Sequence, residues 1–305
     1  MADPVPGAAD PAARAATAAD SGIVLVDCPD EVGLIHRITG VLFARRLNIE
    51  NNQEFVDTAA RHFFFRAEVA AGVAGPAAAA GLVEDLNAVL PAGARVRVTR
   101  GGVRPIVIMG SLEPHCLGEL LLLAASGDLP CTIRAVVGNH DRLRGLTERF
   151  GVPFHHVPAP AAGADDAARL AHEATLERAI MPHAPDYLVL ARYMRVLSAG
   201  FVDRWAGRIV NIHHSFLPAF AGAAPYRQAF VRGVKLIGAT AHFVTRDLDE
   251  GPIIAQDVIP VDHGFTPERM ARAGRDVEKL VLARAVRLLL EERVFVHGRR
   301  TIVFA

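Results

Sequence analysis

The sequence predicts an α/β protein with two domains, a small βαββαβ domain followed by a larger, mostly parallel sheet covered by helices. At 305 residues the chain has room for about two domains with well-filled cores. After Gly101 and Gly102, which mark a short hinge, strand-length apolar runs begin to alternate with helix-length segments. The expected parts are a disordered tail rich in Ala, Pro and Asp at residues 1–21, the small domain at 22–100 and the large domain at 104–305.

The small domain is expected to have the ferredoxin-like order of elements. Its elements are a strand at 23–26, a helix that follows a turn at 29–33, strands at 49–56 and 62–69, an Ala-rich helix carrying Leu82, Leu86 and Val89, and a strand at 94–99. The first helix has Leu34, Ile38 and Leu42 at helical spacing. We expect Asn48 to close it, because asparagine tolerates the left-handed conformation.

The large domain is expected to be Rossmann-like. Its strands are expected at 106–109, 132–137, 187–190, 209–212 and 236–244, with a long helix at 268–293 and a closing strand at 300–304. Continuous apolar strands that alternate with helices are typical of a mostly parallel sheet buried on both faces.

The composition argues against large anionic partners and against a membrane span. Lys plus Arg equals Asp plus Glu, 33 each, so no global field attracts nucleic acid or an anionic membrane. No apolar run reaches the roughly 18 residues that a span needs, and the first residues have neither a secretory nor an Arg-rich transit pattern. The cysteines, Cys28, Cys116 and Cys131, are odd in number and lack paired spacing, which predicts a reducing cytoplasm.

Three polar residues form the candidate catalytic site. Asn211 and His213 stand two apart at the end of a strand-like run, so their side chains share one face. Asp249 follows the strand-like run that ends at Val244. An imidazole, an amide donor and a carboxylate brought together can polarise a carbonyl and handle the proton of a nucleophile.

This group of residues has two alternatives to a catalytic role. His213 and His214 might suggest a metal, but adjacent strand residues face opposite sides, and no other His or Cys has ligand spacing, so no metal is predicted. A single polar strand end could also be a packed histidine with backbone partners. The matching Asn211 and the later Asp249 favour catalysis.

The first strand of the large domain is not followed by a glycine-rich phosphate loop. Residues 109–114, Met-Gly-Ser-Leu-Glu-Pro, lack the glycines that such a loop needs. This counts against a dinucleotide cofactor and against a phosphorylated acceptor. The run Gly138 to Asp141, at another strand end, is equally compatible with ligand binding and with an ordinary turn in which Asp141 caps a helix.

With these motifs in hand, a family resemblance can be stated. Residues 104–305 resemble the folate-dependent formyltransferase fold of glycinamide ribonucleotide and methionyl-tRNA formyltransferases, and residues 22–100, with Cys28 to Leu34, resemble an ACT domain, a ligand-sensing module. Together with His115 to Leu117, Gly138 to Asp141 and Arg192 to Leu197, the chain resembles the formyltetrahydrofolate deformylase family.

The resemblance implies roles for particular residues. Asn211, His213 and Asp249 take the catalytic positions. The residues implied to line or cover the pterin pocket are Met194, Arg195, Val196, Leu197, Leu248, Glu250 and Gly251, and those implied at an effector site are Asp30 and Gly33. Leu112 and Ala224 stand where a lysine and a polar or basic residue are expected on the side of a second substrate.

The function that follows is hydrolysis of 10-formyltetrahydrofolate to tetrahydrofolate and formate, with folate as substrate and no cofactor. His213 and Asp249 would activate water, and Asn211 would stabilise the oxyanion. The resemblance further implies a homo-oligomer and an amino-acid effector, glycine or methionine. The alternatives are a formyltransferase that acts on an amine and a non-catalytic folate or amino-acid sensor.

Overall fold

The computed structural model describes residues 22–70, 75–161, 163–219 and 225–304. The predicted tail at 1–21 and the position of Ala224 lie outside the described residues. The chain divides into two compact units, one up to Val103 and one from Arg104 to Val303. Within the described ranges, no helix is both long and apolar enough to cross a bilayer.

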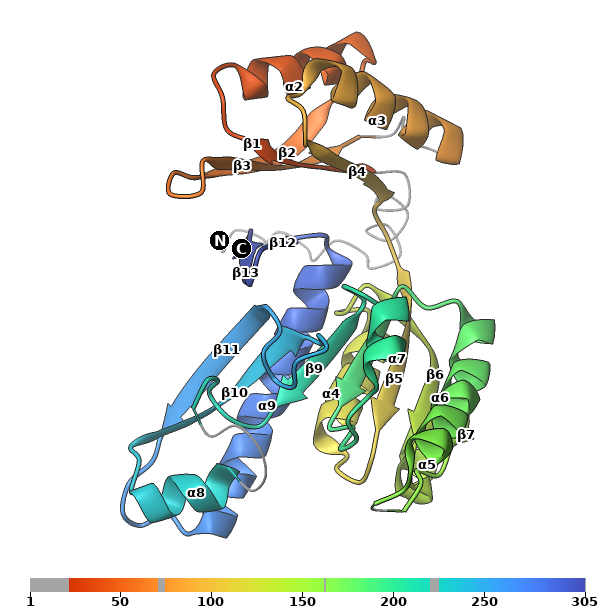
Figure 1. Cartoon of the computed structure of the whole chain (residues 1–305), viewed down its shortest axis with the longest axis vertical. Helices are drawn as coiled ribbons and strands as arrows, with labels where there is room; N and C mark the ends of the chain where they lie inside the picture. The colour runs from red at the N-terminus through yellow and green to blue at the C-terminus, as the bar shows by residue number, and fades with distance from the viewer. Residues whose placement is uncertain (1–21, 71–74, 162, 220–224, 305) are drawn as a thin grey trace, which may run out of the picture. The chain divides into compact units, whose positions relative to one another are not determined.

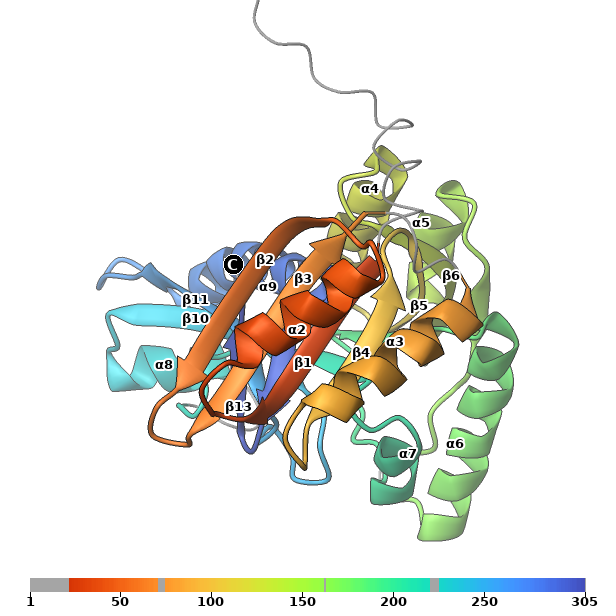
Figure 2. The ribbon, with the colours of Figure 1, turned by 90° about the horizontal axis from the view of Figure 1, so that it is seen from above.

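The first unit has the predicted ferredoxin-like order, which the structure confirms. Its elements are β1 (Gly22–Pro29), α2 (Leu34–Ala44), β2 (Ile49–Asp57), β3 (His62–Val69), α3 (Pro76–Val89) and β4 (Arg95–Arg100). The sheet order is β2-β3-β1-β4, and β1 pairs antiparallel with both of its neighbours. The two helices lie side by side on one face of this sheet (Figure 2). They bury Ile38, Leu82 and Leu86 against Phe65.

The predicted end of the first helix is wrong. Helix α2 ends at Ala44, and the left-handed residue is Arg46, with φ 57°, rather than Asn48. The amide of Leu47 donates to the carbonyl of Leu42 at 2.9 Å, which turns Leu47 back into the buried cluster. The position at which the helix ends is therefore set by the burial of Leu47 and not by the tendency of Asn48 to adopt a left-handed cap.

The second unit is built on a seven-stranded sheet, whose strands and covering helices can be followed in Figure 1. Its elements are β5 (Arg104–Gly110), α4 (His115–Ser126), β6 (Cys131–Gly138), α5 (Arg144–Arg149), β7 (Phe154–His156), α6 (Asp166–Ile180), β8 (Tyr187–Ala191), α7 (Ala199–Arg204), β9 (Ile209–His213), α8 (Pro225–Arg232), β10 (Leu236–Phe243), β11 (Ile253–Pro260), α9 (Pro267–Leu290), β12 (Val294–His297) and β13 (Arg300–Val303). The sequence analysis missed β7, β11 and β12.

The order β11-β10-β9-β8-β5-β6-β7 makes the sheet mixed but mostly parallel. Strands β5 to β9 are parallel, whereas β10 runs antiparallel to both of its neighbours, β9 and β11. Alternate strand residues bury opposite faces: Ile106 and Ile108 pack with α4 and α9, while Val107 and Met109 pack with α6 and α7. The expectation of a sheet covered on both faces is confirmed. The carboxyl ends of β8 and β9 lie next to each other, with Leu190 beside Asn211.

Candidate active site

The β10–β11 connection brings Asp249 beside strand β9. Strand β10 pairs with β9 so that His242 is opposite Asn211 and Thr240 is opposite His213. The loop that follows returns at Pro252, whose carbonyl accepts from the amide of Phe243 at 3.0 Å. Asp249 itself has φ 57°, a left-handed backbone that directs its side chain toward β9.

His213 and Asp249 form a buried imidazole–carboxylate pair. Nδ1 of His213 lies 3.2 Å from Oδ2 of Asp249, and their side chains are only 6% and 12% exposed. The hydrogen bond from His213 lowers the pKa of Asp249, so the carboxylate stays charged. A proton on Nδ1 leaves Nε2 as the free ring nitrogen, and Nε2 is buried without a hydrogen-bond partner among the described residues.

Asn211 is oriented by a second histidine that the sequence analysis missed. Nδ1 of His242 lies 2.9 Å from the carbonyl oxygen of Phe243, which can only accept, so Nδ1 carries the proton. Burial lowers the pKa of His242, which keeps the ring neutral. Nε2 of His242 therefore accepts from the Asn211 amide at 3.3 Å, which leaves one N–H of Asn211 for another oxygen.

A cavity of about 320 Å³ opens over these side chains. Asn211, His213 and Asp249 line it together. The predicted binding residues that also line it are Met194, Arg195, Val196, Leu197 and Leu248. The structure thus brings together an imidazole–carboxylate pair, an amide donor and a mostly apolar slot at the carboxyl ends of neighbouring strands, where open α/β sheets bind ligands.

Comparison with known proteins shows the family to which this chain belongs. Residues 104–286 match the family model described as formyl transferase, and residues 22–80 match the ACT domain model. Relatives named formyltetrahydrofolate deformylase from Haemophilus influenzae and Escherichia coli K12 are 50% and 52% identical to this chain. The first alignment covers 92% of this chain and 98% of the relative, and the second covers 90% and 95%. The chain belongs to the formyltetrahydrofolate deformylase family. It is therefore an enzyme, a hydrolase.

Among solved structures, a deformylase matches nearly the whole of this chain, whereas a transformylase matches only part of it. The structure titled formyltetrahydrofolate deformylase from Pseudomonas syringae has a TM-score of 0.86 and 39% identity, and it covers 93% of this chain and 94% of its own. Glycinamide ribonucleotide transformylase 1 from Symbiobacterium toebii has a TM-score of 0.60 and 33% identity, and it covers 67% of this chain and 95% of its own. The transformylase thus matches only about two thirds of this deformylase-family chain.

The remaining predicted residues lie outside the cavity lining. Glu250 is exposed, with Oε2 2.7 Å from Arg299, and Gly251 is buried against the backbone of Phe243. Asp30 is exposed, and Gly33 has φ 88° just before α2. Leu112 is 43% exposed. Asp141 begins a short 3-10 helix, where its carboxylate is bonded to Arg144.

A second polar group beside the catalytic site was not foreseen from the sequence. We call it the Glu278 cluster: Glu278 of α9, His115 of α4, Arg192 after β8 and Tyr226 of α8. The Glu278 carboxylate is fully buried and lies 2.8 Å from His115 Nε2 and 3.4 Å from Arg192 Nε, and Tyr226 donates to it at 2.6 Å. Burial raises the pKa of Glu278, but His115, Arg192 and Tyr226 outweigh it, so the pKa is lowered.

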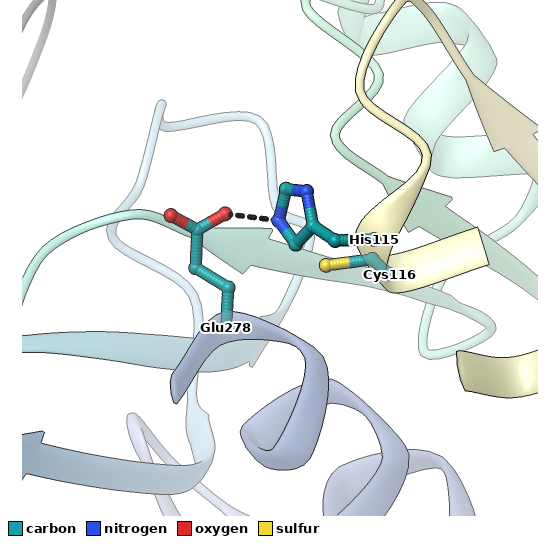
Figure 3. A group of neighbouring side chains, drawn as sticks. All are labelled: His115, Cys116 and Glu278. Carbon is teal, nitrogen blue, oxygen red and sulfur yellow. Dashed lines mark hydrogen bonds and ion pairs between the residues drawn. The ribbon is translucent and has the colours of Figure 1, made fainter. Parts of the chain in front are cut away.

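Figure 3 shows His115 and Cys116 of α4 facing Glu278 of α9. Their three potential ligand atoms lie within 4.8 Å of one another, which makes the group a candidate metal site. However, Glu278 already accepts from His115 and is paired with the Arg192 cation. Burial also raises the pKa of the Cys116 thiol well above its usual value, whereas a metal requires the thiolate. The arrangement is that of an ion-pair network centred on the Glu278 carboxylate.

His214 lies between the Glu278 cluster and the His213–Asp249 pair. Its ring centroid lies 5.2 Å from that of His213 and 6.0 Å from that of Tyr226. Burial, and next the charge of Arg192, lower the pKa of His214 to about 4. His214 is therefore neutral at neutral pH and adds no charge beside the base.

We predict that Gly251→Ala destabilises the second unit. A Cβ at Gly251 would lie 1.7 Å from the carbonyl oxygen of Phe243, so the loop that carries Asp249 must shift. The free energy of unfolding should fall by about 1–3 kcal/mol or more in urea titrations. Gly145→Ala, in the exposed face of α5 with nothing within 4 Å of its Cβ, is the matched control and should be neutral or slightly stabilising. Equal stability of Gly251→Ala and wild type would contradict this account.

We also predict that His242→Phe lowers turnover without weakening substrate binding. The phenyl ring fills similar space but cannot accept from Asn211, so the amide loses its orientation. Loss of one such bond corresponds to about a tenfold lower kcat, with KM nearly unchanged. His155→Phe on the edge strand β7, where the His155 ring is bonded to His183 and lies far along the sheet from Asn211, is the control. A rise in KM with unchanged kcat would refute the orienting role.

Proposed function

We propose that this protein hydrolyses 10-formyltetrahydrofolate to tetrahydrofolate and formate. The observation that carries the proposal is the His213–Asp249 pair in the cavity lining, in which Nε2 of His213 has no hydrogen-bond partner among the described residues. The choice of 10-formyltetrahydrofolate as substrate is supported by the relatives, which are named formyltetrahydrofolate deformylase. Three free, buried cysteines agree with a reducing compartment, and we place the reaction in the cytoplasm.

In the proposed reaction, Nε2 of His213 takes the proton of a water molecule as that water attacks the formyl carbon. Asp249 holds the imidazole through Nδ1 and stabilises the positive charge that the ring gains. The free N–H of Asn211 donates to the developing oxyanion, a contribution of about 3–4 kcal/mol in comparable sites. His213 then returns the proton to the leaving nitrogen, and the C–N bond breaks.

We propose that the folate ring lies along Met194, Arg195, Val196 and Leu197, with Leu248 on the opposite wall. The first four follow β8 and line the cavity, and the amide of Met194 donates to the Ser111 hydroxyl at 3.0 Å. That anchor fixes the loop before ligand arrives. Glu250 and Gly251 serve the loop that carries Asp249 rather than the pocket wall itself.

The deciding experiment is an assay of formate and tetrahydrofolate from the purified protein with 10-formyltetrahydrofolate alone. Equal amounts of both products are expected, and glycinamide ribonucleotide or other amines should neither speed the reaction nor become formylated. Stoichiometric transfer to an amine with little formate would favour a formyltransferase. Binding of the substrate with no turnover would favour a sensor.

We propose that the first unit binds an amino-acid effector and supports a homo-oligomer. Its match to the ACT model supports this role. Gly33 with φ 88° and the exposed Asp30 form the turn before α2, where an effector's amino group could be held by the carboxylate. Glycine or methionine should change the rate of the full-length protein, and Asp30→Ala should remove the response. No binding and no rate change with any amino acid would reject effector sensing.

A further inference from the structure

Arg192 lies at the level of the catalytic base on the neighbouring strand. Leu190 of β8 is beside Asn211 of β9, and continuing that parallel register by two residues brings Arg192 level with His213. Both residues line the same cavity. Arg192 has φ 61°, so its backbone is in the left-handed region that non-glycine residues rarely adopt. Such a conformation at a pocket wall indicates a side chain placed for a purpose.

The guanidinium of Arg192 is paired with Glu278, but this ion pair leaves some of its hydrogen-bond donors unused. Its Nε lies 3.4 Å from Oε2 of Glu278, an ion pair without hydrogen-bond geometry. Nε and Nη1 are both buried and, within the described ranges, neither has a hydrogen-bond partner. Buried donors of this kind are rarely left unmatched in a folded protein. Arg192 therefore has donor capacity beyond what the protein supplies.

The charges around Arg192 favour a small anion rather than a cation. The one carboxylate at the cluster, Glu278, already accepts from His115 and Tyr226. Glu113 approaches only Nδ1 of His115, at 3.9 Å. Asp249 is engaged by His213, and His214 is neutral. Among the described residues, the buried polar atoms of this region that lack a hydrogen-bond partner are Nε and Nη1 of Arg192, Nδ1 of His115 and Nε2 of His213. The two Arg192 atoms are donors, and Nε2 of His213 becomes a donor once it has taken a proton.

We propose that Arg192 forms a binding site for the released formate, beside His213. This rests on the proposed hydrolysis, which generates a carboxylate at the carbon attacked next to His213. A planar carboxylate matches the planar donor fork of a guanidinium. Glu278 fixes the fork from behind, and Arg192 accepts the anion as it forms. Arg192 would thereby draw the product away from the amine nitrogen and disfavour reversal.

The test measures binding of sodium ¹³C-formate to the full-length protein, without folate, by NMR line broadening at constant ionic strength with chloride. For so small a ligand we expect a Kd on the order of 1 mM or weaker. Arg192→Gln, which keeps the length but removes the charge, should weaken binding about tenfold or more. Arg246→Gln is the control, because Arg246 lines the same cavity but is paired with Asp203. It should bind formate as the wild type does.

A second readout covers the case in which Arg192→Gln does not fold. In the wild type, formate should shift the ring-proton resonances of His213 and His214, and chloride at the same concentration should not. The proposal would be overturned if formate had no effect on the wild type, or if Arg192→Gln bound formate as well as the wild type does. Water would then be the ligand of the Arg192 donors. Since no turnover is needed, formate binding can be observed even if the proposed hydrolysis is wrong, and hydrolysis can persist even if no formate binds.

Discussion

His213→Ala should lower the hydrolysis of 10-formyltetrahydrofolate by about four orders of magnitude, the upper range for loss of a general acid–base. Within the described part of the chain, Nε2 of His213 is a ring nitrogen without a hydrogen-bond partner, His213 lines the cavity, and neither neighbouring imidazole is suited to replace it. His214 has its pKa lowered to about 4 by burial, and His242 has its Nε2 engaged by Asn211. Single-turnover measurement of formate release gives the rate directly.

Binding is the control that separates chemistry from folding in His213→Ala. The Kd of an unreactive formylfolate analogue should change by less than about threefold, because the proposed ring contacts come from residues 194–197 and Leu248. His155→Ala, at a histidine pair far along the sheet, should retain full activity. Near-normal turnover in His213→Ala would remove this site from the mechanism.

Asp249→Asn should depress kcat by about 10²- to 10⁴-fold with little change in analogue binding. The carboxylate accepts from Nδ1 of His213 at 3.2 Å, which sets the tautomer that leaves Nε2 free. An amide at that position can donate to Nδ1 instead, and the proton then moves to Nε2, where it blocks base catalysis. Asp276→Asn, on the exposed face of α9, is the matched charge-removing control. A rate within threefold of wild type would show that His213 works without the carboxylate.

The pH dependence of stability gives Asp249 a second signature. Its pKa is lowered in the folded protein, so its contribution to the free energy of unfolding is fully present above its ordinary pKa of 3.8 and is lost as pH falls through the folded value. The stability difference between wild type and Asp249→Asn should therefore be constant from pH 5 upward and shrink in more acidic solution. Urea unfolding at several pH values measures it.

The sequence by itself determined the parts of this protein that depend on local spacing. The period of two along a strand predicted that Asn211 and His213 share a face, and both line one cavity. The alternation of apolar runs and helix-length segments predicted the mostly parallel sheet, and the βαββαβ order predicted the first unit. The catalytic spacing and the ACT-like segment also led to the correct family.

Only the tertiary structure decided which distant residues support that site. His242 reaches Asn211 because β10 pairs with β9 in antiparallel register, and a register between strands cannot be read from either strand alone. His115 and Glu278 are 163 residues apart, and α4 and α9 meet only because both cover the same face of the sheet. The end of α2 was likewise set by burial of Leu47 rather than by the local preference of Asn48. Local periodicity fixes which way a side chain points, whereas the partner it meets depends on how the whole sheet and its helices pack.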